Sequence, residues 1–418
     1  MTLVYGLGRS GLGVLRFLAR RGRNACFHDD HPRHEDVETA RKLGFYSCPP
    51  EPGRFNLVVA APGVSLELPS LQSLARGGAE VIGEAELAWR ETDLPLVGVT
   101  GTAGKTTTTI FTTRLLQQMG IAAAAAGNID PPLVEVVDRP GLETAVVELS
   151  SFQLERTHRF RPRVAVLLNL GTDHLDRHGS LERYHAAKLR LLKNLTPEDA
   201  LVFNASDPLV RAAAMGSRAR RVPFESASTP RQTNARAAAR AATEAARLLG
   251  RPADYDALER AAMQLPAVPG RFEEIGRVGE IAIVDDSIAT RTEAVLAALR
   301  TAPAPIAWIV GGEDKGADLD TLKDTVRERV ALILAVGRDG PRFARAFAPL
   351  ADTVLIEETD GQRALERALE TALAAPGIAS ILLAPLAASF DQFADYKHRS
   401  RAFREALKQV GGEAWTAS

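Results

Sequence analysis

Short apolar runs, each followed by glycine, proline or acidic residues, recur through the first part of the chain. Residues 3–5, 25–28 and 57–60 form three such runs, and a helical pattern after the first continues to about residue 21. Buried strands that alternate with helices are typical of a doubly wound sheet. The pattern therefore predicts a small α/β domain, which we assign to residues 1–91.

The same alternation recurs twice further along the chain. Runs that indicate buried strands lie at 96–99, 145–149, 164–169, 281–285, 307–310, 332–336 and 381–384. A helix is predicted at 106–119, whereas the Ala- and Arg-rich region 206–249 is expected to be shortened or mobile before it turns helical. We predict three α/β domains, with boundaries at 1–91, 92–267 and 268–418.

Composition excludes several classes of protein. The 418 residues carry 45% hydrophobic and 25% charged residues, and no apolar run approaches the roughly 20 residues of a membrane helix. The net charge of -1, with both signs interspersed, gives no broad cationic surface for nucleic acid. The first residues do not resemble a signal peptide. We expect a cytoplasmic, monomeric protein.

The chain contains two cysteines, Cys26 and Cys48. Two cysteines are too few for a disulfide framework or a cysteine-based zinc site, and such low usage fits a reducing compartment. We therefore expect both to be packing residues.

A glycine- and threonine-rich loop carries the clearest chemical signal. It follows a predicted strand and opens a helix, so its amides converge on a phosphate at the positive end of the helix dipole. Lys105 is placed to neutralise β and γ phosphates, and the Thr106 hydroxyl to reach a magnesium ion. A strict Walker motif has glycine at the position of Val99, so this is a variant loop. The alternative is a glycine-rich turn without a ligand.

A second glycine motif, Gly6, Gly8 and Gly11, satisfies the dinucleotide fingerprint, and Asp29 lies near the distance expected for a ribose contact. Alone the motif is compatible with an NAD site or with a structural turn. The phosphate loop at Lys105 favours a nucleotide-linked substrate plus ATP over hydride transfer.

Several longer stretches resemble the Mur ligases, and the resemblance extends over nearly the whole chain. They are Glu148-Leu149-Ser150-Ser151-Phe152-Gln153, residues 169–178, Tyr184-His185-Ala186-Ala187-Lys188, residues 286–290, residues 311–318 and Ala388-Ser389-Phe390-Asp391-Gln392-Phe393. The last two resemble the D-glutamate-adding branch of the family. The resemblance implies a Rossmann-like N-terminal domain, a P-loop ATPase-like central domain and a Rossmann-like C-terminal domain.

The resemblance also implies an activity. In this family the ATP γ-phosphate passes to the carboxylate of a nucleotide-linked substrate, and an incoming amine attacks the acyl phosphate to give an amide. The expected substrates are ATP, UDP-N-acetylmuramoyl-L-alanine and D-glutamate, with Mg²⁺ at two sites. Such chemistry depends on positioning and charge neutralisation.

The resemblance also assigns individual residues to the ATP and metal sites. ATP is expected to contact Gly101, Thr102, Ala103, Gly104, Lys105, Thr106, Thr107, Arg271 and Asp286. Metal is expected at Thr106, Glu148, His174 and Lys188, and the family lysine matched by Lys188 becomes carbamylated. Lys105, Glu148, His174 and Lys188 are the expected catalytic residues. Lys188 alone reads as an ordinary helical lysine, and Arg271 and Asp286 as surface ion-pair residues.

The remaining expected contacts concern the two other substrates. The UDP-linked substrate is expected at Gly6, Gly8, Arg9, Ser10, Gly11, Asp29, Asp30, Pro62, Gly63 and Asn128. D-Glutamate is expected at Thr290, Lys315, Ser389 and Tyr396, where a cation and hydroxyls suit a dicarboxylate.

The chain departs from the family at several polar positions. Ala103 stands in place of an asparagine, Ile288 of a lysine, Gly270 of a histidine and Ala61 of a serine. Arg231 takes the place of an ATP-contacting asparagine, and Tyr396 that of a phenylalanine. Loss of the lysine at 288 removes a charge-assisted contact worth roughly 1.5 to 3 kcal/mol.

These departures keep other hypotheses open beside a D-glutamate ligase. One is a Mur-type or folylpolyglutamate-type ligase that uses another amino acid. Another is a paralogue that binds nucleotide and UDP-sugar without ligation, motivated by Ala103, Gly270 and Ile288. An NAD oxidoreductase is the most distant alternative.

Overall fold

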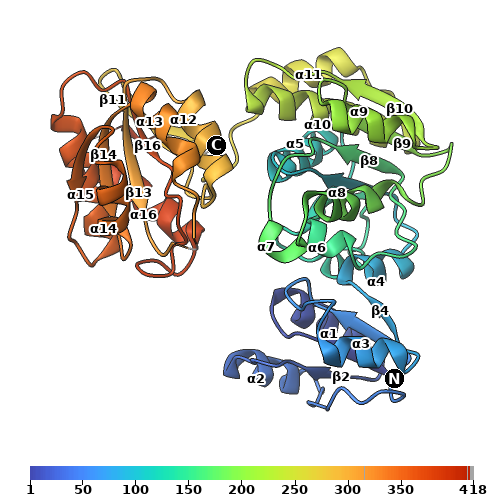
Figure 1. The fold of residues 1–418 in the computed structure, drawn as a ribbon. Helices are drawn as coiled ribbons and strands as arrows, with labels where there is room; N and C mark the ends of the chain where they lie inside the picture. The colour runs from blue at the N-terminus through green and yellow to red at the C-terminus, as the bar shows by residue number, and fades with distance from the viewer. Residues whose placement is uncertain (315, 412, 415–418) are drawn as a thin grey trace. The chain divides into compact units, whose positions relative to one another are not determined.

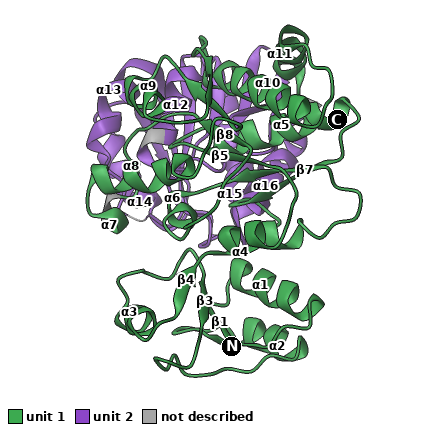
Figure 2. Ribbon diagram, turned by 90° about the vertical axis from the view of Figure 1, so that its right-hand side faces the viewer, with its two compact units in different colours: residues 1–265 green, residues 266–418 purple. Residues whose placement is uncertain are grey.

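The computed structural model describes residues 1–314, 316–411 and 413–414. They divide into two compact units, residues 1–265 and residues 266–418 (Figure 2). Among the described residues, no helix combines the length and apolar character needed to cross a membrane.

The first sheet of the N-terminal unit has four parallel strands in the order β2-β1-β3-β4. It belongs to the N-terminal part of the chain, drawn in blue in Figure 1. Its strands are β1 (Thr2–Tyr5), β2 (Ala25–His28), β3 (Leu57–Ala60) and β4 (Glu80–Ile82). The helices are α1 (Arg9–Arg20), α2 (His34–Lys42), α3 (Pro69–Arg76) and α4 (Glu84–Arg90). The residues that follow β1, β2 and β3 therefore meet at one edge of the sheet, where ligands bind in folds of this kind.

The two cysteines correct an expectation from the sequence. Cys26 in β2 and Cys48 are both buried, as packing residues are, but they are joined by a disulfide. Cys48 lies beside β2 because its backbone N–H donates to the Phe27 carbonyl. The bond therefore closes the segment that contains α2.

The second sheet has six parallel strands in the order β10-β9-β8-β5-β7-β6. Its strands are β5 (Leu96–Thr100), β6 (Ala123–Gly127), β7 (Thr144–Glu148), β8 (Val164–Leu167), β9 (Ala200–Asn204) and β10 (Arg220–Phe224). Its helices are α5 (Lys105–Gln118), α6 (Ser151–Leu154), α7 (Leu175–His178), α8 (Leu181–Leu189), α9 (Pro208–Met215), α10 (Pro230–Leu248) and α11 (Tyr255–Gln264), with short 3-10 turns η1 (Leu133–Glu135) and η2 (Arg190–Leu192). β5 lies between β7 and β8, so the phosphate loop that follows β5 is flanked by the ends of both neighbours.

Helix α4 connects the two sheets of this unit through two buried carboxylates. Glu84 accepts a hydrogen bond from the Val134 amide (2.7 Å). Glu86 accepts from the amides of His158, Arg159 and Phe160, and from Arg90. Both side chains thereby hold loops of the central sheet.

The C-terminal unit contains a seven-stranded sheet in the order β15-β14-β13-β16-β12-β11-β17. Its strands are β11 (Glu273–Val278), β12 (Ile281–Asp285), β13 (Ile306–Gly311), β14 (Val330–Val336), β15 (Asp352–Leu355), β16 (Ser380–Leu383) and β17 (Glu413–Ala414). Its helices are α12 (Thr292–Thr301), α13 (Lys323–Arg329), α14 (Gly340–Phe347), α15 (Gly361–Ala374) and α16 (Tyr396–Gln409), with a 3-10 turn η3 (Asp320–Leu322). β11 pairs antiparallel with β12 and β17, whereas the other pairs are parallel.

The predicted α/β class with three sheets is confirmed. The region 206–249 differs from expectation, because it forms α9, β10 and α10 instead of a trimmed segment. β10 extends the central sheet beyond β9, and α10 packs against α5.

Candidate functional site

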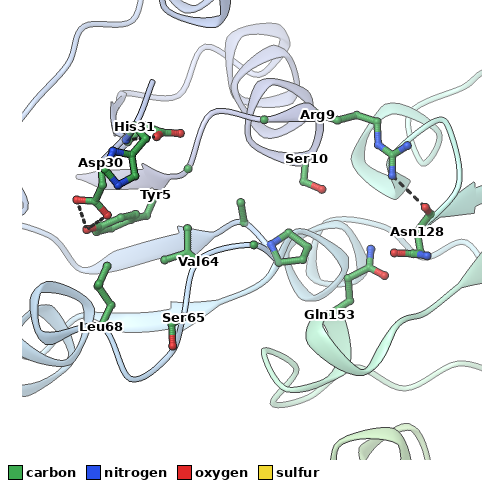
Figure 3. A pocket seen from close by; sticks show the side chains of 16 residues that line it. Tyr5, Arg9, Ser10, Asp30, His31, Val64, Ser65, Leu68, Asn128 and Gln153 are labelled. Carbon is green, nitrogen blue, oxygen red and sulfur yellow. Dashed lines mark hydrogen bonds between the residues drawn. The ribbon is translucent and has the colours of Figure 1, made fainter. Parts of the chain in front are cut away.

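A pocket of about 770 Å³ opens where β1, β2 and β3 end, and two residues of the central sheet region also line it (Figure 3). It is lined by nine of the ten residues predicted for the UDP-linked substrate: Gly6, Gly8, Arg9, Ser10, Asp29, Asp30, Pro62, Gly63 and Asn128. The tenth, Gly11, has a packing role, because a Cβ there would lie 1.9 Å from the Gly6 carbonyl oxygen.

The two aspartates after β2 have different partners. Asp29 accepts from the backbone amides of Leu7 (2.6 Å) and His31 (2.9 Å), so it holds the glycine turn in place. Asp30 accepts from the Tyr5 hydroxyl (3.0 Å), which also contacts Ser70 at 2.8 Å. Burial is the main cause that raises the pKa of Tyr5.

Arg9 lies at the opposite end of the pocket from Tyr5 and Asp30, and its guanidinium points toward Asn128 (Figure 3). It donates to the Asn128 carbonyl and pairs with Asp130, each at 2.9 Å. Its side chain is 50% exposed, so it also faces solvent. Asn128 and Asp130, which follow strand β6, therefore hold Arg9, the one arginine or lysine among the residues that line this pocket.

The phosphate loop requires glycine at one position for two reasons. Gly104 has a φ of +83°, which side chains with a Cβ rarely adopt. A Cβ at Gly104 would also lie 2.3 Å from Oδ1 of Asn234, a residue of α10. Asn234 is therefore adjacent to the predicted ATP site.

A second asparagine fixes the loop at Ala103. The Ala103 amide donates to Asn169 Oδ1 (2.8 Å), and Asn169 Nδ2 donates to the Ala103 carbonyl (3.1 Å). The loop is further held because the Gly171 amide donates to the Thr102 hydroxyl (2.9 Å). Asn169 therefore fixes the backbone of the residue at which the family asparagine is replaced.

Two hard oxygen groups meet beside the loop. The Thr106 hydroxyl donates to Glu148 Oε2 (2.5 Å), and Asn128 donates to Glu148 Oε1 (2.8 Å). Thr106 and Glu148 are both buried. Mg²⁺ is usually held by one or two carboxylates together with substrate phosphates and water. This donor pair fits such an ion, although among the described residues no group of three or more His, Cys, Asp or Glu could hold a metal.

Two lysines contact the same carbonyl. Lys105 Nζ and Lys188 Nζ each donate to the Gly101 oxygen at 2.9 Å, and Lys105 also donates to the Thr102 oxygen. Lys188 is 2% exposed and its Nζ lies 4.4 Å from the centre of the Tyr184 ring. Tyr184 in turn donates to the Thr102 hydroxyl (3.2 Å). Lys188 is thus a buried residue next to the phosphate loop, unlike an ordinary surface lysine.

His174 is held by aromatic neighbours. Its ring lies 4.6 Å from the Phe152 ring in an edge arrangement and 6.3 Å from that of Tyr184. Its Nε2 lies 3.5 Å from Asp173 Oδ2, and its φ is +52°. Tyr184 therefore connects His174, Lys188 and the phosphate loop.

In the C-terminal unit, two departures from the family adjoin the predicted ATP contacts. Asp286 accepts from the Phe272 amide (3.2 Å), and burial raises the pKa of Asp286 to about 7. Arg271 immediately precedes Phe272 and is half-buried. Gly270 has a φ of +70°, and its carbonyl accepts from the Ile288 amide.

Three of the four residues predicted to hold D-glutamate lie in this unit among the described residues. Ser389 is buried, Thr290 is half-buried, and Tyr396 is half-buried at the start of α16. The fourth, Lys315, lies outside the described residues. Arg399 connects the loops that carry Thr290 and Ser389, because it donates to the carbonyls of Ser287 (3.0 Å) and Ala387 (3.1 Å).

Three residues at these sites were not found by sequence reasoning: Asn169, Asn234 and Arg399. Asn169 lay within a quoted motif, and Asn234 lies three positions after Arg231, so both carried a local signal. Arg231 itself donates to the Leu265 carbonyl instead. Asn234, and not Arg231, is thus the residue of α10 that lies against Gly104 of the loop.

Comparison with known proteins agrees with this arrangement. Residues 99–249 match the Mur ligase middle domain, and residues 1–83 match the Mur ligase MurD-like N-terminal domain. The UDP-N-acetylmuramoylalanine--D-glutamate ligase of Thermus thermophilus is 60% identical over the full length of both chains. The chain belongs to the Mur ligase family. The ligase of the same name from Deinococcus radiodurans is 45% identical, over 98% of this chain and 92% of that protein.

Solved structures of Mur ligases share the fold. MurC from Thermotoga maritima has a TM-score of 0.57 at 19% identity, over 98% of this chain and 99% of that chain. MurF from the same organism, in complex with ADP, has a TM-score of 0.54 at 18% identity, over 85% and 95%. The prediction of a Mur ligase with this three-sheet architecture is confirmed.

Proposed function

We propose that this Mur ligase joins D-glutamate to UDP-N-acetylmuramoyl-L-alanine with ATP, in the synthesis of peptidoglycan precursors. The observation that carries the proposal is the 60% identity, over both full lengths, to a ligase of that name. The alternatives of another amino acid, of a paralogue without ligation and of an NAD oxidoreductase have no such support. We assign the substrates to domains 1–91 (UDP-linked substrate), 92–267 (ATP) and 268–418 (D-glutamate).

In the first step, an oxygen of the substrate carboxylate attacks the γ-phosphorus of ATP, and ADP leaves. Lys105 neutralises phosphate charge, while the amides of Gly101–Thr107 orient the phosphates at the start of α5. Bound Mg²⁺ would supply further neutralisation, held by Thr106 and Glu148 at one site and by His174 and Lys188 at the other. Asp286 and Arg271 contact ATP from the C-terminal domain.

In the second step, the amine of D-glutamate attacks the acyl carbon, the amide forms, and phosphate leaves with release of a proton. Thr290, Lys315, Ser389 and Tyr396 hold the two carboxylates of D-glutamate. The pocket at Gly6, Arg9 and Asn128 holds the UDP-linked substrate, so that its carboxylate is presented to ATP. The product remains linked to UDP.

Carbamylation of Lys188 is part of the proposal. Reaction of its amine with CO₂ replaces a cation with an anionic oxygen ligand, which suits Mg²⁺ better than an ammonium group does. The burial of Lys188 and its place at Gly101 support this assignment. We propose a monomer that acts in the cytoplasm, where ATP is supplied.

Phosphate release from ATP tests the function. The assay contains UDP-N-acetylmuramoyl-L-alanine, D-glutamate, Mg²⁺ and bicarbonate, and each substrate is omitted in turn. Release that needs all substrates is the expected result. Folded protein that binds the UDP substrate but releases no phosphate with any amino acid would instead indicate the paralogue without ligation.

A further inference from the structure

The turn after β3, which lines the UDP pocket, is held by two arginines of the central sheet region. Arg177 donates to the carbonyls of Gly63 (3.2 Å) and Val64 (2.8 Å), and Arg156 also donates to the Val64 carbonyl. Both Gly63 and Val64 line the pocket. Hydrogen bonds from a charged donor are stronger than those between neutral groups, so the two arginines fix this turn to the central sheet region.

The two arginines differ in their surroundings. The Arg156 side chain is fully buried and donates also to the Phe152 carbonyl (2.5 Å), and its own carbonyl accepts from the Gly83 amide. Arg156 is therefore a buried structural residue that does not face the pocket surface. Arg177 is half-buried, and its contacts with the turn are made at the pocket wall.

Arg177 is directly connected to His174. Both belong to one helical turn, since the Arg177 amide donates to the His174 carbonyl (3.1 Å). The Phe152 ring lies against both side chains, 5.2 Å from the Arg177 guanidinium carbon and 4.6 Å from the His174 ring. Arg177 therefore joins the pocket wall to His174 by two contacts, one along the backbone and one across Phe152.

We propose that Arg177 is a positioning residue that couples the occupancy of the UDP pocket to the placement of His174, and so to the binding of ATP with Mg²⁺. This inference rests on the proposed function, which assigns the pocket to the UDP-linked substrate and His174 to a metal site. Coupling between two sites is reciprocal, so each ligand tightens the binding of the other by the same factor.

Binding measurements on the full chain test the coupling without turnover. The affinity for UDP is measured by calorimetry, first alone and then with Mg²⁺ and a non-hydrolysable ATP analogue at saturation. We expect UDP to bind at least about fivefold more tightly in the second condition, the lower end of typical couplings. In Arg177→Gln the factor falls to near one, while the affinity for the ATP analogue alone is retained.

Arg183→Gln is the matched control. Arg183 is an exposed arginine of α8 that pairs with Glu67, in the segment after the same turn, at 3.6 Å. The substitution removes an equal charge between the same two parts of the chain, at an arginine that pairs with Glu67 and not with the carbonyls of the turn among the described residues. We expect this variant to keep the coupling of the unaltered protein.

Two results would overturn the proposal: equal coupling in Arg177→Gln and Arg183→Gln, or no coupling in the unaltered protein. If Arg177→Gln does not fold, the same measurement on Arg177→Lys tests the proposal. Lysine keeps the positive charge but cannot contact several carbonyls with one planar group. The variant should show an intermediate factor, and full coupling in it would contradict the role. Phosphate release tests the proposed function separately, so the two can fail independently.

Discussion

The backbone amide of Ile288 donates a 3.2 Å hydrogen bond to the carbonyl of Gly270. The motif resemblance predicts a lysine and a histidine at these two positions in the family, so the two expected departures adjoin one another. The same loop carries Asp286, whose pKa is raised to about 7 by burial. Both expected departures therefore lie close in sequence to one buried carboxyl.

Restoring the lysine should strengthen ATP use. A charge-assisted contact is worth about 1.5 to 3 kcal/mol, so we expect Ile288→Lys to raise kcat/KM for ATP by about tenfold or more. The measurement is steady-state phosphate release at varied ATP. Ile288→Gln, which adds polarity without charge, serves as the control, and equal effects of both changes would contradict the electrostatic reason.

Gly104→Ala should abolish most ATP-dependent activity, because the added Cβ collides with Asn234 and φ is positive. We expect kcat/KM for ATP to fall by about 100-fold, the loss expected when a positioning contact is misplaced. Gly120→Ala is a matched control, since φ is +74° there but a Cβ meets nothing within 4 Å. The control should lose stability and retain ATP affinity; a similar loss of affinity in both variants would point to backbone strain alone.

Glu84 gives a prediction on pH and stability. Burial raises the pKa of Glu84 to about 7, and its Oε2 has no hydrogen-bond partner. A raised pKa means that the folded state binds the proton more tightly than the unfolded state does. The stabilisation of the folded state by this proton is fully present below pH 4.5 and is lost as pH rises through 7. Glu84→Gln removes this dependence.

The expected difference follows from the shift. A change from 4.5 to about 7 corresponds to about 3 kcal/mol. Denaturant unfolding at pH 5 and pH 8 should therefore favour Glu84→Gln over the unaltered protein more strongly at pH 8. A difference that is constant with pH would show that Glu84 does not titrate in this way.

The disulfide gives a further prediction on stability. It closes a loop with a sequence separation of 22 residues, and loops of that size contribute about 3 kcal/mol by the chain-entropy model. Cys26→Ser with Cys48→Ser should lower the free energy of unfolding by that amount, and dithiothreitol should have the same effect on the unaltered protein. If dithiothreitol lowers the stability of the double variant equally, the effect has another source.

The sequence predicted ten of the seventeen strands in the described residues, each within two residues, because buried parallel strands are continuous apolar runs. The strands that it missed are β4, β6, β9, β10, β11, β15 and β17. β6 is almost entirely alanine, which favours helices, and only pairing with β7 makes this segment a strand. In β10, two arginines and a proline interrupt the apolar pattern at the sheet edge.

Site residues could be predicted where they form a local motif, but not where their partners are distant in the sequence. Residues of the glycine turn and the phosphate loop are consecutive, so they could be named from the sequence. Asn234 approaches Gly104 only because α10 packs against α5. Likewise, the Cys26–Cys48 bond depends on the return of the chain beside β2, which no pattern of spacing reveals.

The double hydrogen bond between Asn169 and Ala103 has a consequence for protein engineering. Because Asn169 occupies both the amide and the carbonyl of Ala103, the loop keeps its shape without help from the side chain at 103. The shape of the loop and the chemistry of residue 103 are therefore separable, so a small polar side chain introduced there should alter contacts with ATP and leave the fold of the loop unchanged.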